Sequence, residues 1–245
     1  MKKQTAKILP QIGILIPAFE PNSAHLAELF TRLQSVMVQF DYRVLVVDDG
    51  SQPPIVLPEN IGDRAKLIRH AHNRGKGAAL KSGFRFFLNR KNIDVIITLD
   101  ADLQHPPEKI PDFLRLHQSG KYRLIGGYRS RSPRQMPFHR ILSNTLTSLI
   151  ISLLINQPVR DSQCGFRLID TNLLRKLHLR EERFHLESEL FVRAGWKKFK
   201  IGFVPISTIY NNEKSSIKNV SDTLNFITMI FKLLRERAAT LCFLL

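Results

Sequence analysis

The sequence has 245 residues, 43% hydrophobic and 24% charged, a balance that is typical of a folded domain and excludes a disordered chain. At this length we expect one large domain, or one domain with a short extension. The two cysteines, Cys164 and Cys242, lie far apart and outside any ligand motif. This argues against a disulfide framework or a zinc site and fits a reduced, cytosolic setting.

The net charge of +16 indicates a polyanionic partner, such as nucleic acid, anionic lipid headgroups or a phosphorylated substrate. Half of this excess falls between Phe113 and Arg160, a stretch that has no acidic residue. The basic residues there are Arg115, Lys121, Arg123, Arg129, Arg131, Arg134, Arg140 and Arg160. Nucleic-acid binding would need stacking aromatics interleaved with these charges. Few occur there, so we expect no nucleic-acid partner.

The N-terminus has lysines before an apolar segment, as a secretion signal does. Pro10, Gln11 and Pro17 interrupt that segment and no small-x-small cleavage site follows, so we interpret residues 12–20 as the first strand. No run reaches 18 uninterrupted apolar residues, and we therefore expect no transmembrane helix.

Apolar runs alternate with helical patterns through the first half of the chain. Strands are expected at 12–20, 42–51, 66–69, 93–99 and 122–127. Helices are expected after Ser23 as N-cap, after the loop 72–77 as far as Asn89, and at 107–119. This order predicts a largely parallel sheet with helices on both faces.

The second half is less regular. Residues 140–156 are predicted to form a helix with a polar line of Asn144, Ser148, Ser152 and Asn156, and leucines on the other side. It is either an ordinary core helix or an interfacial one whose apolar side meets a membrane. Further helices are expected at 171–177 and from Phe184, with a strand at 200–205. The tail 221–245 is amphipathic and then apolar.

Acidic side chains follow three of the expected strands. They are Glu20, Asp48 with Asp49, and Asp100 with Asp102. Ligands of open α/β sheets bind at the carboxyl ends of the strands, so three such ends predict a shared crevice. If the chain stays extended, Asp100, Asp102 and Gln104 point to one side and can hold a hard cation, Mg²⁺ or Mn²⁺. An acidic surface turn is the simpler interpretation of that motif taken alone.

Gly75 and Gly77 permit a close approach of backbone to a ligand, and Lys76 supplies charge for a diphosphate. The G-x-x-x-x-G-K-S/T spacing of a P-loop is absent, and no G-x-G-x-x-G follows the first strand.

Five motifs in order resemble those of the inverting family 2 glycosyltransferases, in the branch of dolichyl-phosphate mannose synthases and polyprenyl-phosphate glucosyltransferases. The resemblance covers roughly residues 12–210. The motifs are Ile16–Glu20, Val46–Ser51, Asn73–Gly77, Asp100–Gln104 and Gln163–Arg167.

The resemblance implies a GT-A fold, a Rossmann-like nucleotide-binding sheet, over residues 1–210. The residue pattern of 211–245 predicts an amphipathic helical extension that associates with membranes. The resemblance places Pro17, Glu20, Asp48, Asp49, Lys76 and Asp100 at the nucleotide-sugar donor. It also implies a divalent cation at Asp100, Asp102 and Gln104. Arg129 and Arg167 would face donor or acceptor phosphates, and Asp102 would join them in catalysis.

The sequence is compatible with two kinds of acceptor, a phosphate or a hydroxyl group. A phosphate monoester has a second pKa of about 6 and needs no base, so the acid-free stretch favours a polyprenyl phosphate. A hydroxyl acceptor would need a carboxylate, and Glu187 or Glu189 resembles the family's F-D/E-x-E segment. Either glutamate could also be an ordinary acid in the first turn of a helix.

We therefore expect a metal-dependent hexosyltransferase on the cytoplasmic face of a membrane, attached peripherally to an anionic surface. A nucleotidyltransferase of similar architecture is a remote alternative, because such enzymes have a basic glycine-rich loop where this chain has Ala18–Pro21.

Overall fold

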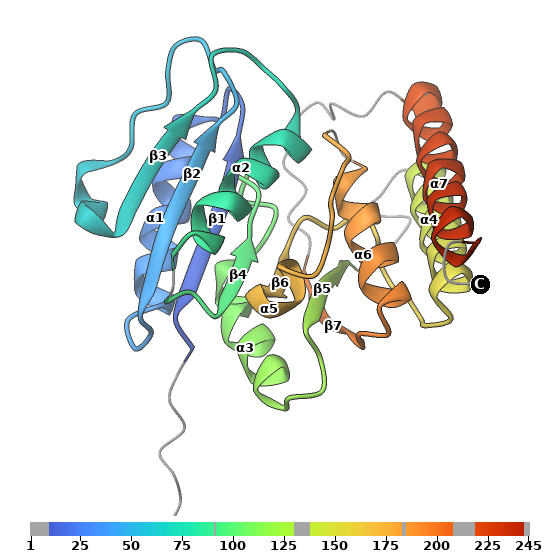
Figure 1. The fold of residues 1–245 in the computed structure, drawn as a ribbon. Coiled ribbons are helices and arrows are strands. Elements are labelled where there is room, and N and C mark those ends of the chain that lie inside the picture. The colour runs from blue at the N-terminus through green and yellow to red at the C-terminus, as the bar shows by residue number, and fades with distance from the viewer. Residues whose placement is uncertain (1–9, 91, 130–137, 183–184, 208–218, 243–245) are drawn as a thin grey trace, which may run out of the picture.

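The computed structural model describes residues 10–90, 92–129, 138–182, 185–207 and 219–242. A seven-stranded sheet in the order β3-β2-β1-β4-β6-β5-β7 runs through the molecule, with helices on both faces (Figure 1). The strands are β1 (Ile12–Ala18), β2 (Tyr42–Asp48), β3 (Ala65–Arg69), β4 (Val95–Thr98), β5 (Leu124–Arg129), β6 (Arg167–Asp170) and β7 (Ile201–Ile206).

The central strand β1 pairs in parallel with β2 and with β4, and every one of its residues is buried. Burial on both faces explains why these strands are continuous apolar runs without alternation. The predicted parallel sheet is confirmed, and its carboxyl ends gather the acidic residues at one edge.

The strand β6 was not predicted from the sequence. It has four residues with a charged one at each end, and it lies antiparallel between β4 and β5. It brings the preceding segment back to the end of β4, where the Thr98 hydroxyl donates to the carbonyl of Gly165 at 2.6 Å. The second half of the chain thereby reaches the crevice of the first.

Two apolar layers cover the sheet. On one face Ile14 packs with Phe30 and Phe113 from α1 (Ser23–Val36) and α3 (Ile110–Gln118). On the other face Leu15 packs with Phe87 of α2 (Lys76–Leu88). The remaining helices on that face are α4 (Phe138–Ile155), α5 (Thr171–Leu174), α6 (Leu186–Trp196) and α7 (Asn219–Cys242). Short 3-10 turns cover Glu59–Arg64 and Pro107–Lys109.

The predicted cap of the first helix was wrong by one residue. Asn22 is the N-cap, and its side-chain oxygen accepts from the backbone N–H groups of Ala24 and His25. Ser23 is the first helical residue. Asn and Ser are comparably good caps, so residue type alone does not separate them.

Helix α4 packs with its polar line inward. The Asn144 amide donates to Asp161, and the hydroxyls of Ser148 and Ser152 accept from the backbone of Ser162 and Val159. Its leucines are left on the surface, with Leu153 74% exposed. The exposed set is Leu142, Leu146, Leu149 and Leu153. Ile151 and Ile155 of the same helix are buried in the apolar cluster on the α2 face of the sheet, as the core interpretation predicts, and a membrane role for the exposed leucines stays a prediction.

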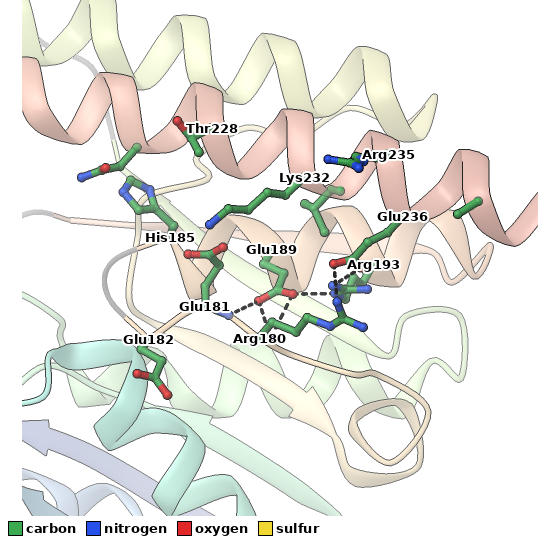
Figure 2. A pocket seen from close by; sticks show the side chains of 13 residues that line it. Arg180, Glu181, Glu182, His185, Glu189, Arg193, Thr228, Lys232, Arg235 and Glu236 are labelled. Atoms are coloured by element: carbon green, nitrogen blue, oxygen red, sulfur yellow. Dashed lines mark hydrogen bonds and ion pairs between the residues drawn. The ribbon is translucent and has the colours of Figure 1, made fainter.

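Helix α7 shows three different sides. Phe226, Met229 and Leu233 are buried in the same apolar cluster as α6. A second side is apolar but exposed, and it consists of Leu224, Ile227, Phe231 and Leu234. The third side is polar and faces α6 (Figure 2). Within the described ranges, no helix combines the length and apolarity needed to cross a bilayer.

Asp170 caps α5 and binds His117 at 3.1 Å and Arg123 at 2.7 Å. Burial raises the pKa of Asp170, but these two partners outweigh it and lower the pKa to about 2. We predict that Asp170→Asn, which keeps a capping oxygen, lowers the free energy of unfolding by roughly 1–2 kcal/mol at neutral pH.

The depressed pKa fixes the sign of the pH dependence. The contribution of Asp170 is complete above the free-carboxyl value of 3.8 and is lost as the pH falls toward 2. Urea unfolding across this range should therefore show the wild-type and Asp170→Asn curves converging in acid, with Asp63→Asn, an exposed acid, as control. A gap that stayed constant with pH would mean a loss of packing instead of a loss of charge.

Candidate functional site

A crevice of about 640 Å³ lies where β1, β2 and β4 end and α2 begins. Glu20, Asp49, Lys76, Asp100 and Asp102 all line it. Pro17, Phe19, Asn73 and Gly75 complete much of the wall. The predicted convergence of three strand ends is therefore present in the structure, and it sits at the edge where open α/β sheets bind ligands.

Lys76 lines the crevice and contacts two carboxylates. Its Nζ lies 2.6 Å from Oδ1 of Asp100 and 3.2 Å from Oε1 of Glu187. Burial alone would lower the pKa of Lys76, but the two carboxylates raise it above its usual value. Burial likewise raises the pKa of Asp100, while the charge of Lys76 lowers it to about 2. Both groups are ionised at neutral pH.

Gly165 and His105 lie next to the Lys76–Asp100 pair. A Cβ built on Gly165 would lie 2.6 Å from an Asp100 oxygen and 2.8 Å from Lys76 Nζ, so a larger residue would displace the ends of both side chains. The Asp100 backbone N–H donates to Nδ1 of His105 at 3.3 Å. Burial lowers the pKa of His105 to about 4, and the ring is neutral at pH 7. No pattern in the sequence predicts the position of His105 beside Asp100.

The neighbouring acids Asp48 and Asp49 have different positions. Asp49 lines the crevice and accepts from the backbone N–H groups of Arg74 and Gly75 and from His70. Asp48 is fully buried and accepts from Ser51 N–H at 2.8 Å. Asp48 thus holds its own loop and is absent from the lining, while Asp49 fixes the loop that leads to Lys76.

The D-x-D segment does not remain extended. β4 ends at Thr98, Leu103 has φ +60°, and the Gln104 N–H donates to Asp102 at 3.0 Å. Asp100, Asp102 and Gln104 therefore do not alternate along a strand, contrary to the prediction from the sequence. A turn brings Asp100 and Asp102 to the crevice, and Gln104 is not among its lining residues.

Two carboxylates on one crevice suit a cation that takes its other ligands from a diphosphate, as Mg²⁺ does in nucleotide sites. Within the part of the chain that the structure describes, no group of three or more His, Cys, Asp or Glu side chains could hold a metal by itself. The residues present therefore fit a cation shared with substrate, and they do not form a closed protein site.

The predicted phosphate-facing arginines are both paired. Arg129 makes two bonds to Asp161, at 2.8 and 3.1 Å. Arg167 is 2% exposed, donates to the Ser162 carbonyl and lies 3.7 Å from Glu187, while its Nε has no hydrogen-bond partner among the described residues. Arg167 is not among the residues that line the crevice. Residues 130–137, with Arg131 and Arg134, lie outside the described residues.

The two candidate bases are separated by the structure. Glu187 belongs to the Lys76 cluster, while Glu189 lines a different pocket against α7 (Figure 2). Glu189 is 1% exposed and binds Arg193 and the backbone N–H groups of Arg180 and Glu181. Glu187 thus contacts Lys76 of the crevice, although it is not itself among the lining residues, while Glu189 belongs to the second pocket.

Cys164 is buried beside His105, with 3.8 Å between Sγ and Nε2. Burial raises the pKa of this thiol to about 12. It is a packed thiol, and its raised pKa disfavours the thiolate form that a nucleophile needs.

Comparison with protein families assigns the chain. Residues 14–178 match the model described as glycosyl transferase family 2. The chain belongs to this family. The predicted family and the predicted enzyme class, a glycosyltransferase, are thereby confirmed.

Several characterised relatives of this transferase act on lipid phosphates. A dolichol-phosphate mannosyltransferase of Pyrococcus furiosus is 25% identical over 77% of the chain and 54% of the relative. A UDP-N-acetylglucosamine–dolichyl-phosphate N-acetylglucosaminyltransferase of Methanococcus voltae is 34% identical over 58% of the chain and 59% of the relative.

An uncharacterised protein of Methanocaldococcus jannaschii is 29% identical over 89% and 96% of the two chains.

Solved structures confirm the predicted GT-A fold of the transferase. A mannosyl-3-phosphoglycerate synthase from Rubrobacter xylanophilus has a TM-score of 0.70 over 94% of this chain and 75% of its own, at 14% identity. A glucosyl-3-phosphoglycerate synthase from Mycobacterium tuberculosis, solved with Mn²⁺ and UDP, has a TM-score of 0.61 over 84% and 73%, at 15% identity.

The close contact at Gly165 gives a test of the crevice. Gly165→Ala should displace the Lys76–Asp100 pair, because the added methyl group meets the ends of both side chains. Those ends are flexible, so we expect a change in the free energy of unfolding below about 1 kcal/mol but a loss of nucleotide binding of at least about tenfold.

Isothermal titration with nucleoside diphosphates and Mn²⁺ measures this loss. The control is Gly202→Ala, whose methyl group meets only Tyr122 and Leu116. Unaltered nucleotide binding by Gly165→Ala would show that the pair is not part of the donor site.

Proposed function

We propose that this transferase moves a hexose from a nucleoside-diphosphate donor to a polyprenyl phosphate, with inversion at the anomeric carbon and with Mg²⁺ or Mn²⁺ bound. The observation that carries the proposal is the crevice in which Lys76, Asp100 and Asp102 meet at the strand ends. It occurs in a chain whose relatives include transferases named for dolichyl phosphate and undecaprenyl phosphate.

The donor end follows from charge. Departure of a nucleoside diphosphate builds negative charge on its leaving oxygen, and Lys76 is a cation that lines the crevice. Asp100 and Asp102 would hold the divalent cation, which supplies further positive charge to the diphosphate. Pro17, Glu20 and Asp49, on the same wall, would contact the nucleoside.

The acceptor end follows from the contacts of Glu187. This carboxylate lies 3.2 Å from Lys76 and 3.7 Å from Arg167, so it is already engaged by two cations of the protein. An ionised phosphate oxygen attacks the anomeric carbon without giving up a proton. The buried, paired glutamate therefore supports a phosphate acceptor. A hydroxyl acceptor with Glu187 as base is the second candidate, since Glu187 is the acid nearest to Lys76 after Asp100.

We further propose that the protein works peripherally on the cytoplasmic face of a membrane, where lipid phosphate is presented. The exposed leucines of α4 support this, because each one left in water forgoes roughly 1.5–3 kcal/mol of burial. The net charge of +16 favours an anionic surface.

Donor binding can be tested by thermal unfolding with UDP-, GDP- and dTDP-sugars, each with and without Mn²⁺. One nucleotide should raise the melting temperature only when Mn²⁺ is present, through linkage of binding to folding. Asp102→Asn should remove this rise without lowering the melting temperature of the free protein.

The control for this experiment is Asp112→Asn, which removes an acid paired only with Lys109 and Arg115 on α3. It should keep the full response. No metal-dependent rise with any donor would refute the proposed donor site.

The acceptor can be tested by comparing polyprenyl phosphate with the corresponding polyprenol. We expect transfer to the phosphate alone, and we expect Glu187→Gln to lower kcat by less than about tenfold. Loss of a general base would instead cost roughly 10²- to 10⁴-fold. Transfer to the polyprenol, with such a loss in Glu187→Gln, would establish the hydroxyl mechanism.

A further inference from the structure

A second cavity, of about 830 Å³, lies between α6 and α7 and shares no lining residue with the donor crevice. Figure 2 shows its walls: the segment from Arg180 to Glu182 below, His185 at one end, and Thr228, Lys232 and Arg235 along α7. The transfer reaction proposed above uses none of these side chains.

Most charges in this cavity cancel. Arg193 bridges Glu189 at 2.6 Å and Glu236 at 2.9 Å, and Arg180 binds Glu236 at 2.7 Å. Glu182 is bound by Lys81 at 3.2 Å. These contacts fix the wall of the cavity and attach α7 to α6.

Two cations remain. Lys232 and Arg235 have no hydrogen-bond or ion-pair partner among the described residues, and both are exposed. Figure 2 shows Lys232 reaching from α7 toward the carboxylate of Glu181 and the ring of His185. The lining as a whole has four cations and four carboxylates, but Glu182 is already bound by Lys81 from outside the cavity. Lys232 and Arg235 therefore face one remaining carboxylate, Glu181, and can bind an anion.

The same helix places this basic side next to an apolar one. Phe231 and Leu234 are exposed immediately before Lys232 and Arg235, and at 100° per residue each pair covers adjoining sides of α7. An apolar side beside a basic side is the arrangement of helices that lie in a membrane interface, with the cations at the level of the phosphates.

We propose that this cavity binds the phosphate of an anionic lipid headgroup through Lys232 and Arg235, while the apolar side of α7 enters the acyl boundary. The inference rests on the peripheral location proposed above and is independent of the transfer reaction. Charge complementarity selects the occupant: a second copy of this chain, itself strongly basic, would meet the free cations with more positive charge.

Vesicle binding of the full chain without donor tests the site, at about 0.15 M salt. The vesicles contain phosphatidylcholine alone or with an equal part of phosphatidylglycerol. We expect Lys232→Gln/Arg235→Gln to weaken partition onto the anionic vesicles about 10- to 30-fold, since each basic residue near such a surface contributes about one tenfold factor or less. Glu181→Gln should strengthen it several-fold, because it removes the opposing carboxylate.

The matched control is Lys66→Gln/Arg85→Gln, which removes the same charge from β3 and α2 near the other edge of the sheet. It should change partition less than about threefold. Phe231→Ser should weaken binding to both kinds of vesicle while leaving their ratio as in wild type. If both double variants lost the same amount of vesicle binding, net charge alone would explain the attraction and the proposed site would be wrong. The site would also be wrong if Lys232→Gln/Arg235→Gln bound vesicles as wild type does.

A soluble phosphate is the other source of the same chemistry. Glycerol 3-phosphate should not raise the melting temperature at millimolar concentration if the site needs the apolar contact as well. A rise in melting temperature that depends on Lys232 and Arg235, together with equal binding to both kinds of vesicle, would contradict the proposed lipid ligand. The ligand would then be a soluble phosphate ester. Donor-induced shifts are measured on the same variants and should match wild type, so failure of the donor site is seen separately.

Discussion

The contact between Lys76 and Asp100 determines how the crevice is built. Two opposite charges lie 2.6 Å apart, at the start of α2 and the end of β4, and Gly165 leaves free the space that their side-chain ends occupy. They require a second acid to balance the surrounding cations, and Glu187 of α6 provides it. Four separate segments therefore have to be in place before the site has its charge pattern.

Pairing also explains why the total charge overstates the free positive surface. In the acid-free stretch, Arg115, Arg123 and Arg129 are bound by Asp112, Asp170 and Asp161, which all lie just outside it. The cations that remain without partners include Lys232 and Arg235, far along the chain on α7. Counting residues along the sequence finds the excess of charge but not its location on the surface.

The sequence was sufficient for the parallel strands, because buried runs such as Ile12–Ala18 are apolar at every position. It was sufficient for the crevice, because strand ends meet at one edge. It failed for β6, whose four residues have no periodicity, and for Asp161, whose partner Arg129 is distant in sequence. It also failed for His105, whose contact with Asp100 forms only because a turn follows β4. It could not orient α4 either, since the pattern defines two sides and only the Asp161–Ser162 segment decides which is inside.

The position of β6 has a consequence for the order of folding. β5 is joined to the sheet only through β6 and β7, and β4 has β6 as its outer neighbour. A nascent chain that ends before Arg167 would leave the edge of β4 bare and β5 without a partner, and such edges pair with other chains. Pairing of the four residues from Arg167 to Asp170 thus completes the sheet on both sides of β6. A chain truncated before them should aggregate instead of forming a stable half-domain.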